Sequence, residues 1–113
     1  MQQFMAWKVK YFQTARGYYP VKDFIEDQDK PTYAKLISAV ELLETDGPYL
    51  KPPYIKKLRN KLYEFRISGK VAIRIFYTVH NSEYYLLHAF KKKAQKTPSQ
   101  ELKIALDRMK EIV

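Results

Sequence analysis

Cysteine is absent from the 113-residue sequence. Its absence excludes a disulfide scaffold, a thiolate metal site and a cysteine nucleophile, and it favours a reducing compartment. Only three glycines are present, and the sequence contains no glycine-rich phosphate loop and no serine nucleophile motif. No apolar run approaches the roughly 20 residues of a membrane-spanning helix, and residues 1–13 lack a basic segment followed by an apolar one. We therefore expect a cytoplasmic protein that does not enter a membrane.

The residues that are present are typical of one globular domain. Hydrophobic residues make up 46% of the chain and charged residues 29%, so the sequence is too apolar to be a disordered polymer. Most domains contain about 100–150 residues. We therefore expect a single domain over residues 1–113.

Positive charge is concentrated in the second part of the chain. Residues 1–49 contain six Lys or Arg and seven Asp or Glu, a net charge of −1, whereas residues 50–113 contain fifteen and five, a net charge of +10. Such clustering favours a nucleic acid as partner, because phosphate neutralisation releases counterions. The alternative is a basic, solvated surface without a partner.

The spacing of apolar residues predicts an α+β fold. Helical spacing predicts a helical hairpin, with one helix over Pro20–Gln28 and a second from Pro31 to the breaker Gly47. Alternating spacing predicts strands, which we place at Phe4–Phe12, Leu62–Ile67, Val71–Val79 and Glu83–Phe90, with a further short strand at Tyr54–Leu58. A C-terminal helix reaching Val113 is predicted to begin with Thr97 as N-cap, Pro98 as first residue and Gln100 in a capping box.

Two arginines occupy the interiors of neighbouring predicted strands. An odd number of loop residues places Arg66 and Arg74 on one sheet face, and a three-residue loop sets Arg74 directly opposite Glu64. A buried arginine requires a carboxylate, solvent or a ligand. The arginines are therefore either part of a binding site or members of a cross-strand ion pair that solubilises the outer face.

One group of lysines follows the last predicted strand, and a second basic group lies in and after the short predicted strand Tyr54–Leu58. They could form a phosphate-binding groove with the arginines, with a wall of tyrosines for stacking bases, or they could be solvated loops. The lysine and arginine candidates are Lys56, Lys57, Arg59, Lys61, Lys91, Lys92, Lys93 and Lys96. The tyrosines are Tyr54, Tyr63, Tyr77, Tyr84 and Tyr85, most of which we expect in the core or at its rim.

The two histidines do not form a metal site by their spacing. His88 lies in an apolar strand, where a structural role is more frequent than a catalytic one, and His80 lies in a turn. No carboxylate cluster has the spacing of a magnesium site. We expect any phosphoryl chemistry to proceed without a metal ion or other cofactor.

A set of short motifs resembles the phage-derived HigB-type toxins of the RelE/ParE superfamily, and the resemblance covers nearly the whole chain. The motifs are Lys56–Leu58, Leu62–Arg66, Ile73–Tyr77, Leu87–Lys93 and Gln95–Pro98. The resemblance implies two helices packed on a curved antiparallel sheet. It also implies a ribosome-dependent endoribonuclease that cuts mRNA in the decoding site, and neutralisation by a helix-turn-helix antitoxin.

The same resemblance implies roles for individual residues. Arg66 and Arg74 match arginines around the scissile phosphate, and Lys92 or Lys93 matches a basic residue after the last strand. Bidentate guanidinium contacts suit the charge of a crowded phosphorane. The sequence departs from some relatives in having no tyrosine after Lys96, so Glu64, His88 and a lysine are all open as the proton acceptor.

Two other functions use the same features differently. A ParE-like toxin would inhibit a topoisomerase by binding, but such proteins generally lack the basic catalytic set that Arg66, Arg74 and the lysine run would supply here. A non-enzymatic RNA-binding module would need only the charge. The expected partners are mRNA on the ribosome and ribosomal RNA, together with the antitoxin.

Overall fold

The computed structural model describes residues 7–93 and 95–113. Within these residues a five-stranded sheet with strand order β1-β5-β4-β3-β2 is combined with helices, which confirms the α+β fold. The strands are β1 (Lys8–Tyr11), β2 (Ile55–Arg59), β3 (Leu62–Ile67), β4 (Ile73–His80) and β5 (Glu83–Lys91). The helices are α1 (Pro20–Glu26), α2 (Lys30–Asp46), the short 3₁₀ helix η1 (Gly47–Tyr49) and α3 (Ser99–Met109).

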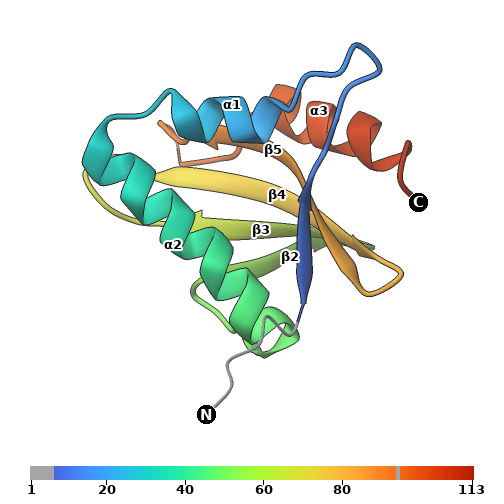
Figure 1. Ribbon diagram of the computed structural model, residues 1–113, viewed down its shortest axis with the longest axis horizontal. Helices are drawn as coiled ribbons and strands as arrows, with labels where there is room; N and C mark the ends of the chain where they lie inside the picture. Colours follow the sequence, from blue (N-terminus) through green and yellow to red (C-terminus); the bar gives the residue numbers. More distant parts are fainter. Residues whose placement is uncertain (1–6, 94) are drawn as a thin grey trace.

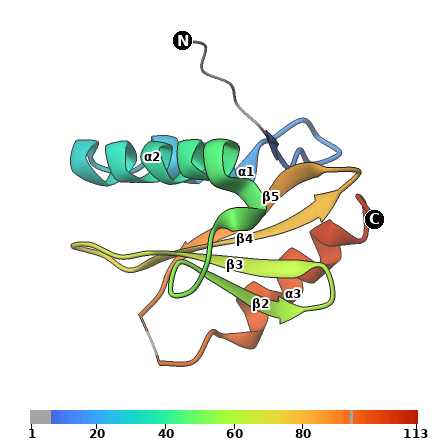
Figure 2. The ribbon, with the colours of Figure 1, turned by 90° about the horizontal axis from the view of Figure 1, so that it is seen from below.

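The sheet is the middle of three layers. Helices α1 and α2 lie over one face and α3 lies against the other (Figures 1 and 2). Each face has its own apolar cluster. The larger includes Leu36, Phe65 and Ile75 under the helical hairpin, and the smaller includes Phe76 and Ala105 under α3. We call the face that packs against α3 the arginine face, because Arg66 and Arg74 extend from it, and the other the hairpin face.

The N-terminal strand differs in one respect from the expected antiparallel sheet. Strand β1 is hydrogen-bonded to β5 in parallel, in the register Val9 with Tyr84, so it forms a sheet edge. The other strand pairs are antiparallel. The predicted start of this strand at Phe4 lies outside the described residues.

Proline and aspartate position the helical hairpin. Pro20 is the first residue of α1, and Pro31 lies in the first turn of α2, where a missing N–H costs nothing. Asp29 caps α2 by accepting a hydrogen bond from the Thr32 N–H at 2.9 Å. Gly47 ends the helix as predicted, with a φ of 48° that favours glycine.

The β3–β4 loop is longer than predicted. Ile67 pairs with Ile73, so five residues, not three, connect the strands. The five loop residues are not register partners of β3; Val71 packs instead against the cluster under the helical hairpin, and the Ala72 carbonyl accepts a hydrogen bond from the Lys92 N–H at 2.8 Å at the end of β5. Five is still an odd number, so both arginines remain on one face.

The start of α3 also differs from prediction. Pro98 is the N-cap, with ψ at 138°, and no side chain caps the helix. The predicted cap by Thr97 is therefore wrong. The first backbone hydrogen bonds of the helix, from the N–H groups of Glu101 and Leu102, go to the Pro98 carbonyl at 3.1 Å and 3.4 Å. Thr97 therefore lies one residue before the N-cap position.

Candidate functional site

The centre of the arginine face is a directly opposed pair of arginines on adjacent strands. Arg66 of β3 and Arg74 of β4 are register partners, whereas Glu64 is opposite Phe76. The predicted pairing of Glu64 with Arg74 is therefore wrong, because the longer loop shifts the register by two residues. The predicted placement of both arginines on one face is correct.

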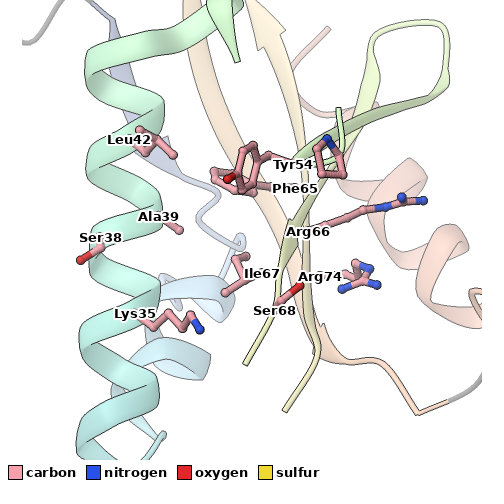
Figure 3. Close-up of a pocket in the computed structure, with 11 residues that line it drawn as sticks. Lys35, Ser38, Ala39, Leu42, Tyr54, Phe65, Arg66, Ile67, Ser68 and Arg74 are labelled. Carbon is pink, nitrogen blue, oxygen red and sulfur yellow. The ribbon is translucent and has the colours of Figure 1, made fainter. Parts of the chain in front are cut away.

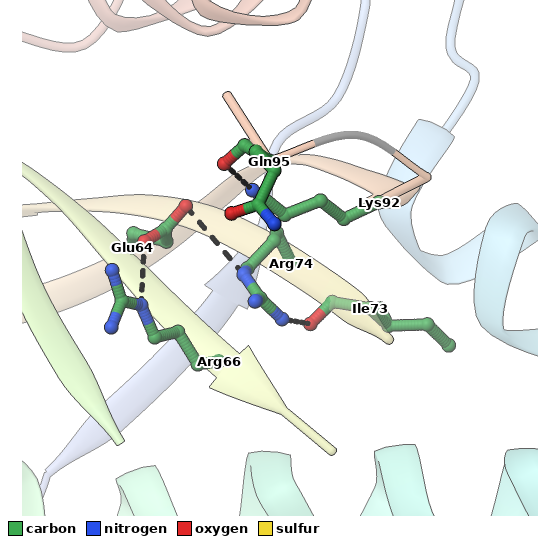
Figure 4. A network of polar contacts seen from close by, with 6 residues as sticks. All are labelled: Glu64, Arg66, Ile73, Arg74, Lys92 and Gln95. Carbon is green, nitrogen blue, oxygen red and sulfur yellow. Dashed lines mark hydrogen bonds and ion pairs between the residues drawn. The ribbon is translucent and has the colours of Figure 1, made fainter. Parts of the chain in front are cut away.

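A buried carboxylate compensates both guanidinium groups: Glu64 lies two residues before Arg66 on β3 and diagonally across from Arg74 on β4. Glu64 Oε1 accepts a hydrogen bond from Arg66 Nε at 2.9 Å, and Glu64 Oε2 lies 3.8 Å from Arg74 Nε (Figure 4). The Glu64 side chain is 3% exposed, that of Arg74 16% and that of Arg66 37%. Arg74 also donates from Nη1 to the Ile73 carbonyl at 3.1 Å. The pair is therefore fixed at its inner side and open to solvent at Arg66.

Lys92 joins this group from the end of β5. Its Nζ donates to the Gln95 carbonyl at 2.5 Å (Figure 4), and it follows Phe90, the register partner of Arg74, by two residues, so it projects on the same face. Three positive groups and one carboxylate therefore lie together, a local charge of +2 for these four side chains. Lys93 and Lys96 are exposed in the segment that leads to α3.

The remaining basic candidates divide between the two faces. Lys56 is the register partner of Glu64, so it projects on the arginine face, whereas Lys57 is the partner of Tyr63 on the hairpin face. Lys91 is the partner of Ile73 in the hairpin-face core, and its charge contributes, after the dominant hydrogen bonds from Thr32, to the lowered pKa of Asp29. Lys57 and Lys91 are thus not brought to the arginine pair.

Two further candidates lie at the β2–β3 turn. Arg59 pairs with Leu62 beyond a bulge, and Leu62 packs in the cluster under α3. Lys61 occupies the turn with a φ of 66° and is exposed. Both are cationic side chains at the far end of the arginine face from the β3–β4 loop.

His88 lies on the arginine face but under α3. Its Nε2 is 2.6 Å from Glu101 Oε1, and Arg108 Nη1 lies 3.4 Å from its Nδ1. Burial lowers the pKa of His88, Glu101 opposes this shift, and the Arg108 charge adds to it. A neutral ring that donates from Nε2 and accepts at Nδ1 satisfies both contacts. This arrangement ties the imidazole to α3.

The predicted tyrosines do not form one wall on the arginine face: Tyr63, Tyr77 and Tyr84 pack in or against the cluster under the helical hairpin, whereas Tyr85 packs against the cluster under α3. Tyr63 and Tyr77 stack on each other with ring centroids 5.4 Å apart, and they line a hollow of about 380 Å³ on the hairpin face. Tyr77 and Tyr84 are buried, and burial raises the pKa of the Tyr77 hydroxyl. The expectation that most of these tyrosines are core or rim residues is correct.

A groove of about 530 Å³, partly lined by Arg66 and Arg74, is not predicted by any pattern in the sequence. It runs between α2 and the end of β3, past the exposed ring of Tyr54 (Figure 3). Figure 3 shows Lys35 and Leu42 on the α2 side, with the side chains of Arg66 and Arg74 extending away from the helix. No period or spacing relates α2 to the edge of β3, so only the folded chain shows this groove.

The part of the chain that the structure describes contains neither a cluster of metal-ligating side chains nor a helix that could span a membrane. In residues 7–93 and 95–113, no group of three or more histidine, aspartate or glutamate side chains is placed to hold a metal ion. Over the same residues, no helix has the length and apolar character needed to cross a membrane.

The five-stranded sheet, with a helical hairpin on one face and α3 on the other, defines a RelE-like α+β protein. Residues 23–110 match the family model of the phage-derived Gp49-like proteins (DUF891). Because the match covers more than half of the chain, the protein belongs to this family, which is a RelE-like toxin family. Comparison with the curated proteins gave no match.

Proposed function

We propose that the protein is a HigB-like toxin of a type II toxin–antitoxin system that cuts mRNA on the ribosome without a metal ion. The observation that carries this proposal is the directly opposed pair Arg66 and Arg74 on the arginine face. Two guanidinium groups on directly opposed residues of adjacent strands can contact different oxygens of one phosphate. The family membership supports a toxin, and the +10 charge of residues 50–113 supports an RNA target.

The proposed reaction is attack of an RNA 2′-hydroxyl on its own 3′-phosphate. The 2′-oxygen forms a bond to phosphorus, the 2′ proton goes to an acceptor, and the bond to the leaving 5′-oxygen breaks. Arg66 and Arg74 stabilise the negative charge that builds on the phosphoryl oxygens. The ammonium group of Lys92 or Lys93 supplies the proton that the 5′-oxygen requires.

The basic residues around the pair hold the rest of the substrate in this proposal. Lys56 on the arginine face and the exposed Lys93 and Lys96 contact phosphates of mRNA or ribosomal RNA. A toxin that acts on the ribosome works in the cytoplasm. His88 supports α3 because both ring nitrogens are engaged there. A helix-turn-helix antitoxin would neutralise the toxin.

The test is expression of the toxin alone in a bacterial host, with labelled amino acids and labelled thymidine. We expect amino-acid incorporation to stop first, and Arg74→Ala to abolish this effect because loss of one preorganised donor lowers a rate by about 10²–10³-fold. Arg16→Ala, in the exposed loop after β1, is the matched control and should remain toxic.

An earlier fall in thymidine incorporation would support the topoisomerase-inhibiting alternative. Toxicity that survives Arg74→Ala, with circular dichroism showing a folded variant, would show that Arg74 is only an ion-pair partner. Translation arrest without new mRNA ends would support an RNA-binding module without nuclease activity.

A further inference from the structure

Glu64 is the most deeply buried charged side chain on the arginine face, and the proposed reaction does not use it as a reactant. Its 3% exposure and its place between Arg66 and Arg74 require an explanation, since an unpaired buried carboxylate is costly. The ion pairs meet this requirement. They also determine where the two guanidinium groups lie.

The Glu64 carboxylate offsets the repulsion between the two arginines that the strand register places opposite each other. Like charges placed directly opposite each other on adjacent strands repel, and Arg66 and Arg74 are such a pair. Glu64 contacts both arginines through Nε, at 2.9 Å and 3.8 Å. Contacts through Nε leave the Nη groups of Arg66 and Nη2 of Arg74 for a phosphate, whereas Arg74 Nη1 donates to the Ile73 carbonyl at 3.1 Å. The Glu64 carboxylate therefore orients Arg66 by a hydrogen bond, and together with the Ile73 carbonyl it orients Arg74.

We propose that Glu64 is a positioning residue that aligns Arg66 and Arg74 for the scissile phosphate and limits the positive charge of the site. This inference rests on the proposed function. A general base must come within about 3 Å of the 2′-hydroxyl, but the Glu64 oxygens face the two guanidinium groups and are shielded from solvent. The residue acts on the arginines and does not touch the reacting atoms.

This role has a distinctive consequence for Glu64→Gln. The amide retains the size of the side chain but removes its charge, so the charge of Glu64, Arg66, Arg74 and Lys92 together rises from +2 to +3. RNA should therefore bind more tightly in the ground state. Cleavage should be slower, because loosened guanidinium groups are less well aligned in the transition state. Binding and cleavage thus move in opposite directions.

Another carboxylate in the same sheet provides a matched control. Glu83 lies 2.9 Å from Lys10 Nζ and 3.8 Å from Lys8 Nζ, at the β1–β5 edge. Glu83→Gln makes the same change in net charge, also next to two cations, but away from the arginine pair. It should leave both RNA affinity and cleavage unchanged.

The experiment compares wild type, Glu64→Gln and Glu83→Gln in two assays. Affinity is measured with a short RNA that carries a 2′-deoxy sugar at the cleavage position, and the cleavage rate is measured in single turnovers on programmed ribosomes over a range of pH. For Glu64→Gln we expect several-fold tighter binding and cleavage about 10- to 100-fold slower, with the shape of the pH–rate profile retained. Loss of one limb of the profile would identify Glu64 as the proton acceptor and overturn the proposal. Parallel losses of binding and cleavage would also overturn it.

Two further measurements keep the proposal testable if Glu64→Gln does not fold or if wild type does not cleave RNA. Glu64→Asp keeps the charge but shortens the side chain, so cleavage should fall while RNA affinity stays the same. The Nε–H NMR signal of Arg66 should exchange slowly with water in wild type and faster in Glu64→Asp. Equal exchange in the two proteins would overturn the positioning role. Absence of cleavage by wild type would refute the nuclease and leave this measurement informative.

Discussion

Arginines inside this small domain need compensating groups, and the sequence predicts only some of them. The sequence predicts that Arg74 needs a carboxylate, solvent or a ligand, and Glu64 supplies a carboxylate, although from a diagonal and not an opposite position. Arg108 is compensated by groups that no local pattern indicates. It donates to the Leu87 carbonyl at 2.8 Å and lies over the Phe12 ring. Short-range partners follow from strand alternation, whereas partners on distant elements follow from tertiary packing.

Gly47 allows a test at the scale of one residue. Its φ is 48°, and a Cβ added there would lie 2.4 Å from Trp7 Cδ2. Gly47→Ala should therefore reduce the free energy of unfolding by about 1–3 kcal/mol, measured by urea denaturation. At Gly69 an added Cβ would meet only the flexible end of the Lys35 side chain, at 2.8 Å. Gly69→Ala should therefore change the free energy of unfolding by less than about 0.5 kcal/mol. Equal losses in the two variants would contradict this explanation.

At the scale of elements, periodicity predicts the interiors better than the ends. Helical and alternating spacing of apolar residues predicts the two helices of the hairpin and strands β3, β4 and β5 close to their observed positions. The predicted β3–β4 loop length is wrong because Val71 packs against the helical hairpin, a contact distant in sequence, and is not paired with β3. The predicted helix after Thr97 exists, but its first backbone hydrogen bonds go to the Pro98 carbonyl, so its N-cap is Pro98 and not Thr97.

The contact of α3 with the sheet should depend on pH through His88. Burial lowers the pKa of His88 in the folded protein, so the neutral ring stabilises the fold above the unfolded-state pKa of about 6.5. This stability is lost as the pH falls through the folded pKa, because a protonated Nδ1 cannot accept from Arg108. Hydrogen exchange in α3, after division by the intrinsic rate of each amide at the same pH, should therefore accelerate on acidification below about pH 6.5.

A glutamine substitution at each of the two histidines gives a matched pair of variants for this experiment. His88→Gln should remove most of the acid-dependent change in α3 exchange, whereas His80→Gln, at the end of β4, should retain it. A wild-type α3 whose exchange does not respond to acid would show that His88 does not control this contact. The pH response is thus assigned to one side chain on one element.

At the scale of the whole molecule, the sequence predicts the amount of charge but not its distribution over faces. The +10 of residues 50–113 was visible from composition, and alternation predicts that neighbours point to opposite faces. The strand register and the positions of the helices determine which sheet face holds the arginines. They also place Lys91 on the opposite face. Only a subset of the positive charge therefore belongs to the proposed RNA site.

Lys56 and Lys57 test this distribution, because they are neighbours in β2 that project on opposite faces. If RNA lies on the arginine face, Lys56→Gln should remove one phosphate contact and flatten the slope of log affinity against log salt by roughly 0.7 for single-stranded RNA. Lys57→Gln makes the same charge change on the hairpin face and should leave the slope at the wild-type value. Fluorescence anisotropy with a short labelled RNA over a range of potassium concentrations measures both slopes. Equal flattening in the two variants would mean that RNA contacts follow the net charge of the molecule and not one face of its sheet.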